Sequence, residues 1–139
     1  MNVKGIMSTR LITVTPEENV TSAVKRMTEH DISGMIVVKA GSGIGVITMR
    51  DIFRKVLSCD LDPNSTLVSQ VMSQPLITVH ELREIEAAAK SMRSRKVRRL
   101  GVVNSANKLT GIITAMDIVS HLPEYIKLMF ETWVRPGWR

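Results

Sequence analysis

The sequence predicts a mixed α/β (α+β) fold made of two β-α-β-β-α repeats packed with pseudo-twofold symmetry. Three observations support this fold class. The stretch IMSTRLITV at residues 6–14 matches VMSQPLITV at residues 71–79 at six of nine positions. The stretch GVITMRDI at 45–52 matches GIITAMDI at 111–118 at five of eight positions. The segments between these blocks share one hydrophobic pattern, so the whole unit is duplicated.

Each repeat is expected to open with a strand, at residues 11–14 and 76–79, followed by an amphipathic helix. The apolar positions of the helix have the spacing i, i+3, i+4, i+7. They are Val20, Ala23, Val24 and Met27 in the first copy and Ile85, Ala88, Ala89 and Met92 in the second. In the first copy Thr15 is expected to cap the helix, with Pro16 at its first position and Glu18 completing a capping box. The second copy, at residues 80–84, begins without such signals.

Two short strands and a second helix complete each repeat. Apolar runs at residues 35–38 and 100–103 precede turn residues at 40–43 and 104–107. The strands that follow end at Thr48 and Thr114, and a helix is expected to begin near Asp51 or Asp117. Residues 59–66 form a polar connection, which divides the chain into repeat 1 (1–60), repeat 2 (61–122) and a C-terminal tail (123–139). Because one such unit has a thin core, the two copies are expected to pack together with clefts at their junction.

Composition limits the classes of protein that fit. The chain has 139 residues, of which 44% are apolar and 23% charged, as in globular proteins. The sequence shows no signal peptide, no apolar run long enough to span a membrane, and a single cysteine, Cys59, without a metal-ligand cluster around it. We therefore expect a cytoplasmic protein without a membrane partner. The net charge of +6 favours anionic partners such as nucleotides, nucleic acid or acidic lipid.

The pattern Gly-hydrophobic-hydrophobic-Thr-x-x-Asp-Ile occurs in both copies and suits a ribose-phosphate site. The glycine permits a close backbone approach, the threonine hydroxyl can donate to phosphate or ribose, and the aspartate can accept hydrogen bonds from two vicinal hydroxyls. The helix N-terminus adds N–H groups that favour an anion. The same Thr-x-x-Asp spacing is also a helix-capping device, and a capping role and a ligand role can coexist.

These residues resemble a tandem pair of CBS (cystathionine beta-synthase) domains, also called a Bateman module. The resemblance rests on Ile6-Met-Ser with residues 11–14, on Val71-Met-Ser with residues 76–79, and on the two Gly-h-h-Thr-x-x-Asp segments, and it covers about residues 3–122. It implies a regulatory module that binds AMP, ADP, ATP or S-adenosylmethionine in two clefts, requires no other cofactor, and signals to an attached or partner protein. Many relatives have a proline where this chain has Ile36 and Gly101.

The resemblance also implies which residues bind the ligand, with the Thr-x-x-Asp of one copy facing the adenine pocket of the other. One cleft would use Thr48, Asp51, Met72, Ile77, Val97, Arg98 and Arg99, and the other Thr114, Asp117, Met7, Ile12, Ile32 and Ser33. Arg98, Arg99 and Arg50 could neutralise phosphate in the first cleft, where the second has Ser33, Gly34 and Met116. We therefore expect the first cleft to prefer phosphorylated nucleotides.

Two other functions compete with a ligand-binding module. A nucleic-acid-binding protein could use the basic run at residues 90–99, although the run lacks interleaved aromatic residues and no DNA-binding motif is present. An enzyme is disfavoured because the sequence shows no paired acid and base, no activated nucleophile and no metal set. The tail at 123–139, which holds both tryptophans, is expected to cover the module or pack in a second subunit, since exposed apolar patches usually have a partner. Pairs of this family commonly form flat dimers, so a homodimer is expected.

Overall fold

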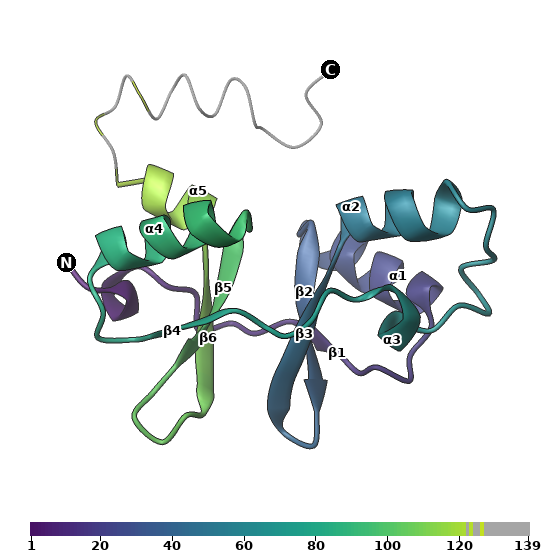
Figure 1. Cartoon of the computed structure of the whole chain (residues 1–139), viewed down its shortest axis with the longest axis horizontal. Helices are drawn as coiled ribbons and strands as arrows, with labels where there is room; N and C mark the ends of the chain where they lie inside the picture. Colours follow the sequence, from purple (N-terminus) through teal and green to yellow (C-terminus); the bar gives the residue numbers. More distant parts are fainter. Residues whose placement is uncertain (122, 124–125, 127–139) are drawn as a thin grey trace. The chain divides into compact units, whose positions relative to one another are not determined.

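The computed structural model describes residues 1–121, 123 and 126 and divides the chain into two compact units (Figure 1). Unit 1 comprises Met1–Thr9 and Val79–Arg139, and unit 2 comprises Arg10–Thr78. Leu122, expected in the last helix, and nearly all of the tail at 123–139 lie outside the described residues. Within the described part of the chain, every helix is too short or too polar to cross a membrane.

Unit 2 contains the elements of the first repeat. They are β1 (Thr13–Val14), α1 (Val20–His30), β2 (Gly34–Lys39), β3 (Ser42–Thr48), α2 (Met49–Ile52), the π-helical turn η2 (Phe53–Leu57) and α3 (Val68–Val71). The sheet has the order β1-β2-β3, with β1 parallel and β3 antiparallel to β2. Apolar side chains of α1, α3, α2 and η2 pack with those of the sheet to form one buried core, which includes Val20, Met27, Ile47, Val56 and Val68.

Unit 1 repeats this order. Its elements are the 3-10 turn η1 (Val3–Gly5), β4 (Thr78–His80, which begins at the boundary with unit 2), α4 (Ile85–Arg95), β5 (Arg99–Val103), β6 (Leu109–Thr114) and α5 (Ala115–Val119). The sheet order is β4-β5-β6, with β5 antiparallel to β6. The two β-α-β-β-α repeats and the mixed α+β class predicted from the sequence are therefore confirmed. The short helices η1 and α3 were not predicted, because three or four residues are too few to show a helical period.

The start of α1 differs from the prediction. The helix begins at Val20, and its N-cap is Asn19, whose side-chain oxygen accepts a hydrogen bond from the Ser22 amide at 2.8 Å. Thr15 and Glu18 instead close a separate turn before the helix, in which the Thr15 amide donates to Glu18 Oε2 at 2.7 Å. This turn is held by α3, because the Ser69 amide donates to the Pro16 carbonyl at 3.0 Å and the Val68 amide to the Glu18 carbonyl at 2.8 Å. The capping box predicted at Thr15–Glu18 was therefore wrong as a helix start.

Glu18 also forms the shortest ion pair of the described residues. Arg26 Nη2 lies 2.7 Å from Glu18 Oε1, and Arg26 Nη1 donates to the Thr13 carbonyl at 2.6 Å, so the pair joins α1 to β1. The hydrogen bond from Arg26 lowers the pKa of Glu18 from 4.5 to about 2, while partial burial opposes this shift. In the second repeat, Arg83 and Ser91 stand at the corresponding positions. Helix α4 accordingly starts as predicted, without a strong cap: Glu84 stands at its N-cap and contacts the amino terminus of Met1 at 3.3 Å.

The two sequence repeats exchange the segments that precede their first strands, so each compact unit contains a short segment of the other repeat. Ser73, from the start of the second repeat, forms two backbone hydrogen bonds with Val46 of β3 at 2.9 and 2.8 Å. Ser8, from the start of the first repeat, does the same with Ile112 of β6 at 2.9 Å in both directions. A Cβ atom on Gly45 would lie 2.6 Å from the Ser73 carbonyl oxygen, and one on Gly111 would lie 2.7 Å from the Ser8 carbonyl oxygen. The glycines of the duplicated motif therefore permit a close approach of another protein segment, the Met-Ser segment of the other repeat. Their predicted role beside a ligand stays a prediction.

Candidate ligand-binding site

Both Thr-x-x-Asp segments form capping boxes at the start of a helix. In unit 2, Asp51 Oδ2 accepts hydrogen bonds from the Thr48 amide at 3.1 Å and the Thr48 hydroxyl at 3.0 Å. In unit 1, Asp117 Oδ2 accepts the same two bonds from Thr114 at 2.7 and 2.9 Å. Each threonine hydroxyl in turn accepts a hydrogen bond from the aspartate amide. The capping role weighed at the sequence level is therefore confirmed for both copies, and it uses only one oxygen of each carboxylate.

The second carboxylate oxygen differs between the units. Asp51 Oδ1 accepts a hydrogen bond from the Ser73 hydroxyl at 3.1 Å and lies 3.3 Å from the ammonium group of Lys55. Among the residues that the structure describes, Asp117 Oδ1 has no hydrogen-bond donor. The carboxylate of Asp117 can thus accept further hydrogen bonds from a ligand without losing its cap.

The neighbouring strand places different side chains beside the two threonines. Thr48 pairs with Gly34 across the β2–β3 ladder, whereas Thr114 pairs with Arg99 across the β5–β6 ladder. The Met49 amide donates to the Ser33 carbonyl at 2.9 Å, and the Ala115 amide donates to the Arg98 carbonyl at 2.8 Å. The register therefore brings the positively charged Arg98 and Arg99 to the Thr114–Asp117 segment. At the corresponding positions unit 2 has the uncharged Ser33 and Gly34.

Each threonine strand is also flanked by a methionine from the exchanged segment. The sulfur atoms of Met72 and Met7 lie 3.4 and 2.9 Å from the positions that a Cβ on Gly45 and Gly111 would occupy. Both methionines are half-buried, and Met72 packs against the core of unit 2. Each unit thus combines a capping aspartate, a threonine and an apolar thioether within one local arrangement.

The residues predicted from the resemblance are divided between the units. Unit 2 holds Ile12, Ile32, Ser33, Thr48, Arg50, Asp51, Met72 and Ile77, and unit 1 holds Met7, Val97, Arg98, Arg99, Thr114 and Asp117. The structure brings Met72 to the strand of Thr48, and it brings Met7, Arg98 and Arg99 to the strand of Thr114. The grouping of Val97, Arg98 and Arg99 with Thr48 and Asp51 stays a prediction. Sequence reasoning missed Lys55 and Ser73, although the i, i+4 spacing of Asp51 and Lys55 is a signal for an ion pair.

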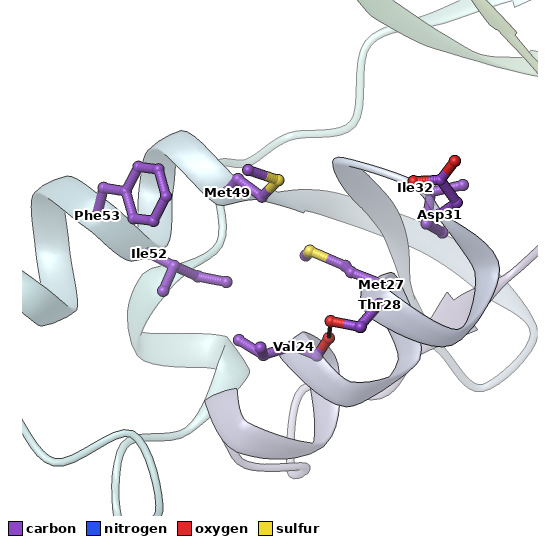
Figure 2. A pocket seen from close by; sticks show the side chains of 8 residues that line it. All are labelled: Val24, Met27, Thr28, Asp31, Ile32, Met49, Ile52 and Phe53. Carbon is purple, nitrogen blue, oxygen red and sulfur yellow. Dashed lines mark hydrogen bonds between the residues drawn. The ribbon is translucent and has the colours of Figure 1, made fainter. Parts of the chain in front are cut away.

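A cavity of about 350 Å³ lies in unit 2 between helices α1 and α2. Figure 2 shows that its lining side chains come from α1 and its C-terminal turn on one side and from α2 and Phe53 on the other. They are Val24, Met27, Thr28, Asp31, Ile32, Met49, Ile52 and Phe53. Thr48 and Asp51 do not line this cavity, and its apolar character suits packing by another protein surface better than it suits a ribose or phosphate.

The basic run at residues 90–99 lies on α4 and at the start of β5. Lys90, Arg93, Arg95, Lys96 and Arg98 are exposed, while Arg99 is half-buried. Lys90, Arg93 and Arg95 lie on α4, and Lys96 and Arg98 follow its end. The run contains no aromatic residue, so this segment lacks the base-stacking platform of a single-strand binder. Within the described residues, no three histidine, cysteine or acidic side chains gather into a metal-binding group.

The comparisons with known proteins agree with this architecture. The family model of the CBS domain matches residues 3–58 and again residues 68–124. The chain therefore belongs to the CBS domain family and contains a tandem pair of CBS domains.

Particular relatives resemble the chain over most of its length. It is 36% identical over 122 residues to an uncharacterised protein of Methanopyrus kandleri. The matched region covers 87% of this chain but only 62% of that protein. It is 32% identical to Hypoxic response protein 1 of Mycobacterium tuberculosis, over 91% of this chain and 89% of that protein. A crystal structure of Hypoxic Response Protein I with two coordinated zinc ions matches with a TM-score of 0.77 and 31% identity, covering 88% of this chain and 100% of that one.

A ligand-bound structure is also similar. The crystal structure of a CBS domain pair in complex with 5′-methylthioadenosine and S-adenosyl-L-methionine matches with a TM-score of 0.76 and 28% identity, over 86% of this chain and 94% of that one.

Proposed function

We propose that this chain is a non-catalytic regulatory module that binds adenosine-containing ligands, of the AMP, ADP, ATP or S-adenosylmethionine type, and signals to a partner protein. The observation that carries the proposal is the duplicated aspartate at a helix start. One oxygen of each aspartate caps the helix, and the other oxygen of Asp117 has no hydrogen-bond donor among the described residues. A ribose diol offers two O–H donors, and hydrogen bonds to a carboxylate are stronger than those to a neutral acceptor. The similar CBS pair that holds two adenosyl compounds supports the ligand class.

Charge within each unit supports a refined assignment of ligands. Arg99 lies opposite Thr114 in the β5–β6 ladder, and Arg98 adjoins the helix that carries Asp117. A guanidinium fork matches phosphate oxygens, and the N-terminal amides of a helix favour an anion. The Thr114–Asp117 segment is therefore proposed to take the phosphorylated nucleotide, in place of the Thr48–Asp51 segment that the sequence favoured.

Calorimetric titration tests this function directly. Full-length protein is titrated with AMP, ADP, ATP, 5′-methylthioadenosine and S-adenosylmethionine. We expect at least one ligand to bind, and Asp117→Asn to weaken the preferred ligand by about tenfold or more, because it removes a charged acceptor of the ribose hydroxyls. Glu86→Gln, an exposed acid-to-amide change on α4, is the matched control and should leave binding unchanged.

The competing function has a separate readout. If no adenosyl ligand binds and the protein retards DNA or RNA in a salt-sensitive manner, the basic run on α4 is the functional surface and the proposal is wrong. If ligands bind but Asp117→Asn has no effect, the assignment of Asp117 fails.

A second copy of the chain is the proposed partner of the apolar face of unit 2. Val24, Met49, Phe53 and Leu57 are exposed large apolar side chains of α1, α2 and η2, and Phe53 is 53% exposed at the rim of the 350 Å³ cavity (Figure 2). A twofold axis would place the same patch against itself, so that each Phe53 projects beside the cavity of the other copy. The corresponding residues of unit 1 are Ala89, Ala115, Val119 and Pro123, which offer less apolar surface.

A further inference from the structure

The geometry points to Lys55 as a residue that occupies the ligand-binding oxygen of Asp51 from within the protein, so that the Thr48–Asp51 segment binds adenosyl ligands more weakly than the Thr114–Asp117 segment. This inference rests on the proposed function and concerns which of the two repeats takes ligand first. It assigns to Lys55 and Ser73 the role of selectivity-determining residues.

The two carboxylates form the same helix cap. Both Oδ2 atoms accept two hydrogen bonds from the threonine three residues earlier, at 3.0–3.1 Å for Asp51 and 2.7–2.9 Å for Asp117. Because Oδ2 is committed to the helix cap in both units, Oδ1 is the oxygen that remains for a ribose hydroxyl.

In unit 2, Asp51 Oδ1 already has two partners. The Ser73 hydroxyl donates to it at 3.1 Å, and Lys55 Nζ lies 3.3 Å away. Lys55 Nζ also donates to the Val71 carbonyl at 2.9 Å, so the ammonium group is held between α3 and the carboxylate. The Asp51 side chain is only 13% exposed, while that of Lys55 is 45% exposed. A neutral ribose diol would have to replace a charged donor at a carboxylate that is largely shielded from water, which weakens binding.

The second repeat lacks this arrangement among its described residues. His121 follows Asp117 by four residues, as Lys55 follows Asp51, and Ser8 occupies the position of Ser73. His121 Nδ1 lies 2.9 Å from the backbone carbonyl of Asp117 and 3.2 Å from the Ser120 hydroxyl. The imidazole therefore faces the backbone and not the carboxylate, and Asp117 Oδ1 keeps its acceptor capacity within the described part of unit 1.

A titration in the Asp117→Ala background isolates the Asp51 site. The probe is 5′-methylthioadenosine, which carries no phosphate, so that removing a positive charge at residue 55 cannot weaken binding through a lost phosphate contact. Adding Lys55→Met should tighten binding by about two- to fivefold, which is the range for a partly exposed ion pair. Lys55→Arg should bind as weakly as the Asp117→Ala parent, because the guanidinium keeps the contact with Asp51.

Two controls make the outcome decisive. Lys25→Met removes an exposed lysine from α1 of the same unit and should leave binding unchanged. Circular dichroism of each variant establishes that it is folded. If wild-type protein binds the probe but Lys55→Met leaves the Asp117→Ala affinity unchanged or weakens it, Lys55 does not compete with ligand and the inference is wrong, while the proposed function stands. If wild-type protein binds none of the five adenosyl ligands, the proposed function fails and the inference with it.

Discussion

The two units share the same order of strands and helices but differ in the partners of their charged side chains. Both contain a capping box, a glycine beneath an exchanged Met-Ser segment, and a helix that ends in a left-handed residue, Asp31 or Lys96. In unit 2, Glu18 pairs with Arg26 and the candidate site residue Asp51 pairs with Lys55. In unit 1 the strand register brings Arg98 and Arg99 to the Thr114–Asp117 segment, and Asp117 Oδ1 has no hydrogen-bond donor among the described residues. The difference teaches that the duplicated part of this protein is the scaffold, and that the charged residues around the two Thr-x-x-Asp segments are what distinguishes them.

The apolar face of unit 2 provides the prediction with the largest expected effect. The corresponding residues of unit 1 are smaller, so the two units should respond differently to a charged substitution. Phe53→Asp places a charge in the proposed contact between two copies, which should convert a dimer to a monomer and halve the mass measured by light scattering. Leu82→Asp, at an apolar residue of unit 1 that is 59% exposed, should leave the mass unchanged. A wild-type mass equal to that of one chain would exclude the proposed dimer.

The exchanged segments provide the second prediction, in which the two units should behave alike. Gly45→Ala puts a Cβ 2.6 Å from the Ser73 carbonyl, and Gly111→Ala puts one 2.7 Å from the Ser8 carbonyl. Each change should lower the free energy of unfolding by about 2 to 3 kcal/mol, the scale of overpacking a fixed interior. Urea denaturation measures the loss.

The matched control is Gly5→Ala, where the nearest atom would lie at 3.6 Å. It should change the free energy of unfolding by less than about 0.5 kcal/mol, as at an ordinary surface position. Equal stability of Gly45→Ala and Gly5→Ala would show that the close approach of Ser73 is not a constraint on the fold.

The Glu18–Arg26 ion pair, which unit 1 lacks at the corresponding positions, provides the prediction with the smallest expected effect, a pH-dependent change in the free energy of unfolding. The hydrogen bond from Arg26 lowers the folded pKa of Glu18 to about 2, so the pair stabilises the protein above pH 4.5 and loses this contribution as the pH falls from 4.5 towards 2. Glu18→Gln should lower the free energy of unfolding by about 1 kcal/mol at pH 7, because both side chains are partly exposed. Chemical denaturation over this pH range should show the difference from wild type disappearing at low pH.

The neighbouring Glu17→Gln is the control, since Glu17 is exposed and lies outside the ion pair. It should match wild type at every pH. A Glu18→Gln deficit that persists unchanged at pH 2 would show that the side chain acts through its size and not through its charge.

Much of the fold could be predicted from the sequence because the repeat and the periods of its helices and strands are local signals. The two capping boxes at Thr48–Asp51 and Thr114–Asp117 follow from a three-residue spacing and were anticipated as one of two roles. The start of α1 was not, because Thr15-x-x-Glu18 has the spacing of a capping box while α3, which lies some fifty residues later, holds that segment in a separate turn. Contacts with a segment far along the chain therefore decide where this helix begins.

The sequence by itself determined the duplicated β-α-β-β-α order, the paired aspartates and the positive charge at residues 98 and 99, since these depend on residue identity and spacing within a few turns of chain. Only the tertiary structure decided that Ser73 and Ser8 cross to the other repeat, that Arg99 faces Thr114, and that Lys55 lies on Asp51. The physical reason is that strand register and the path of a connecting segment are set by which backbone groups find hydrogen-bond partners far along the chain.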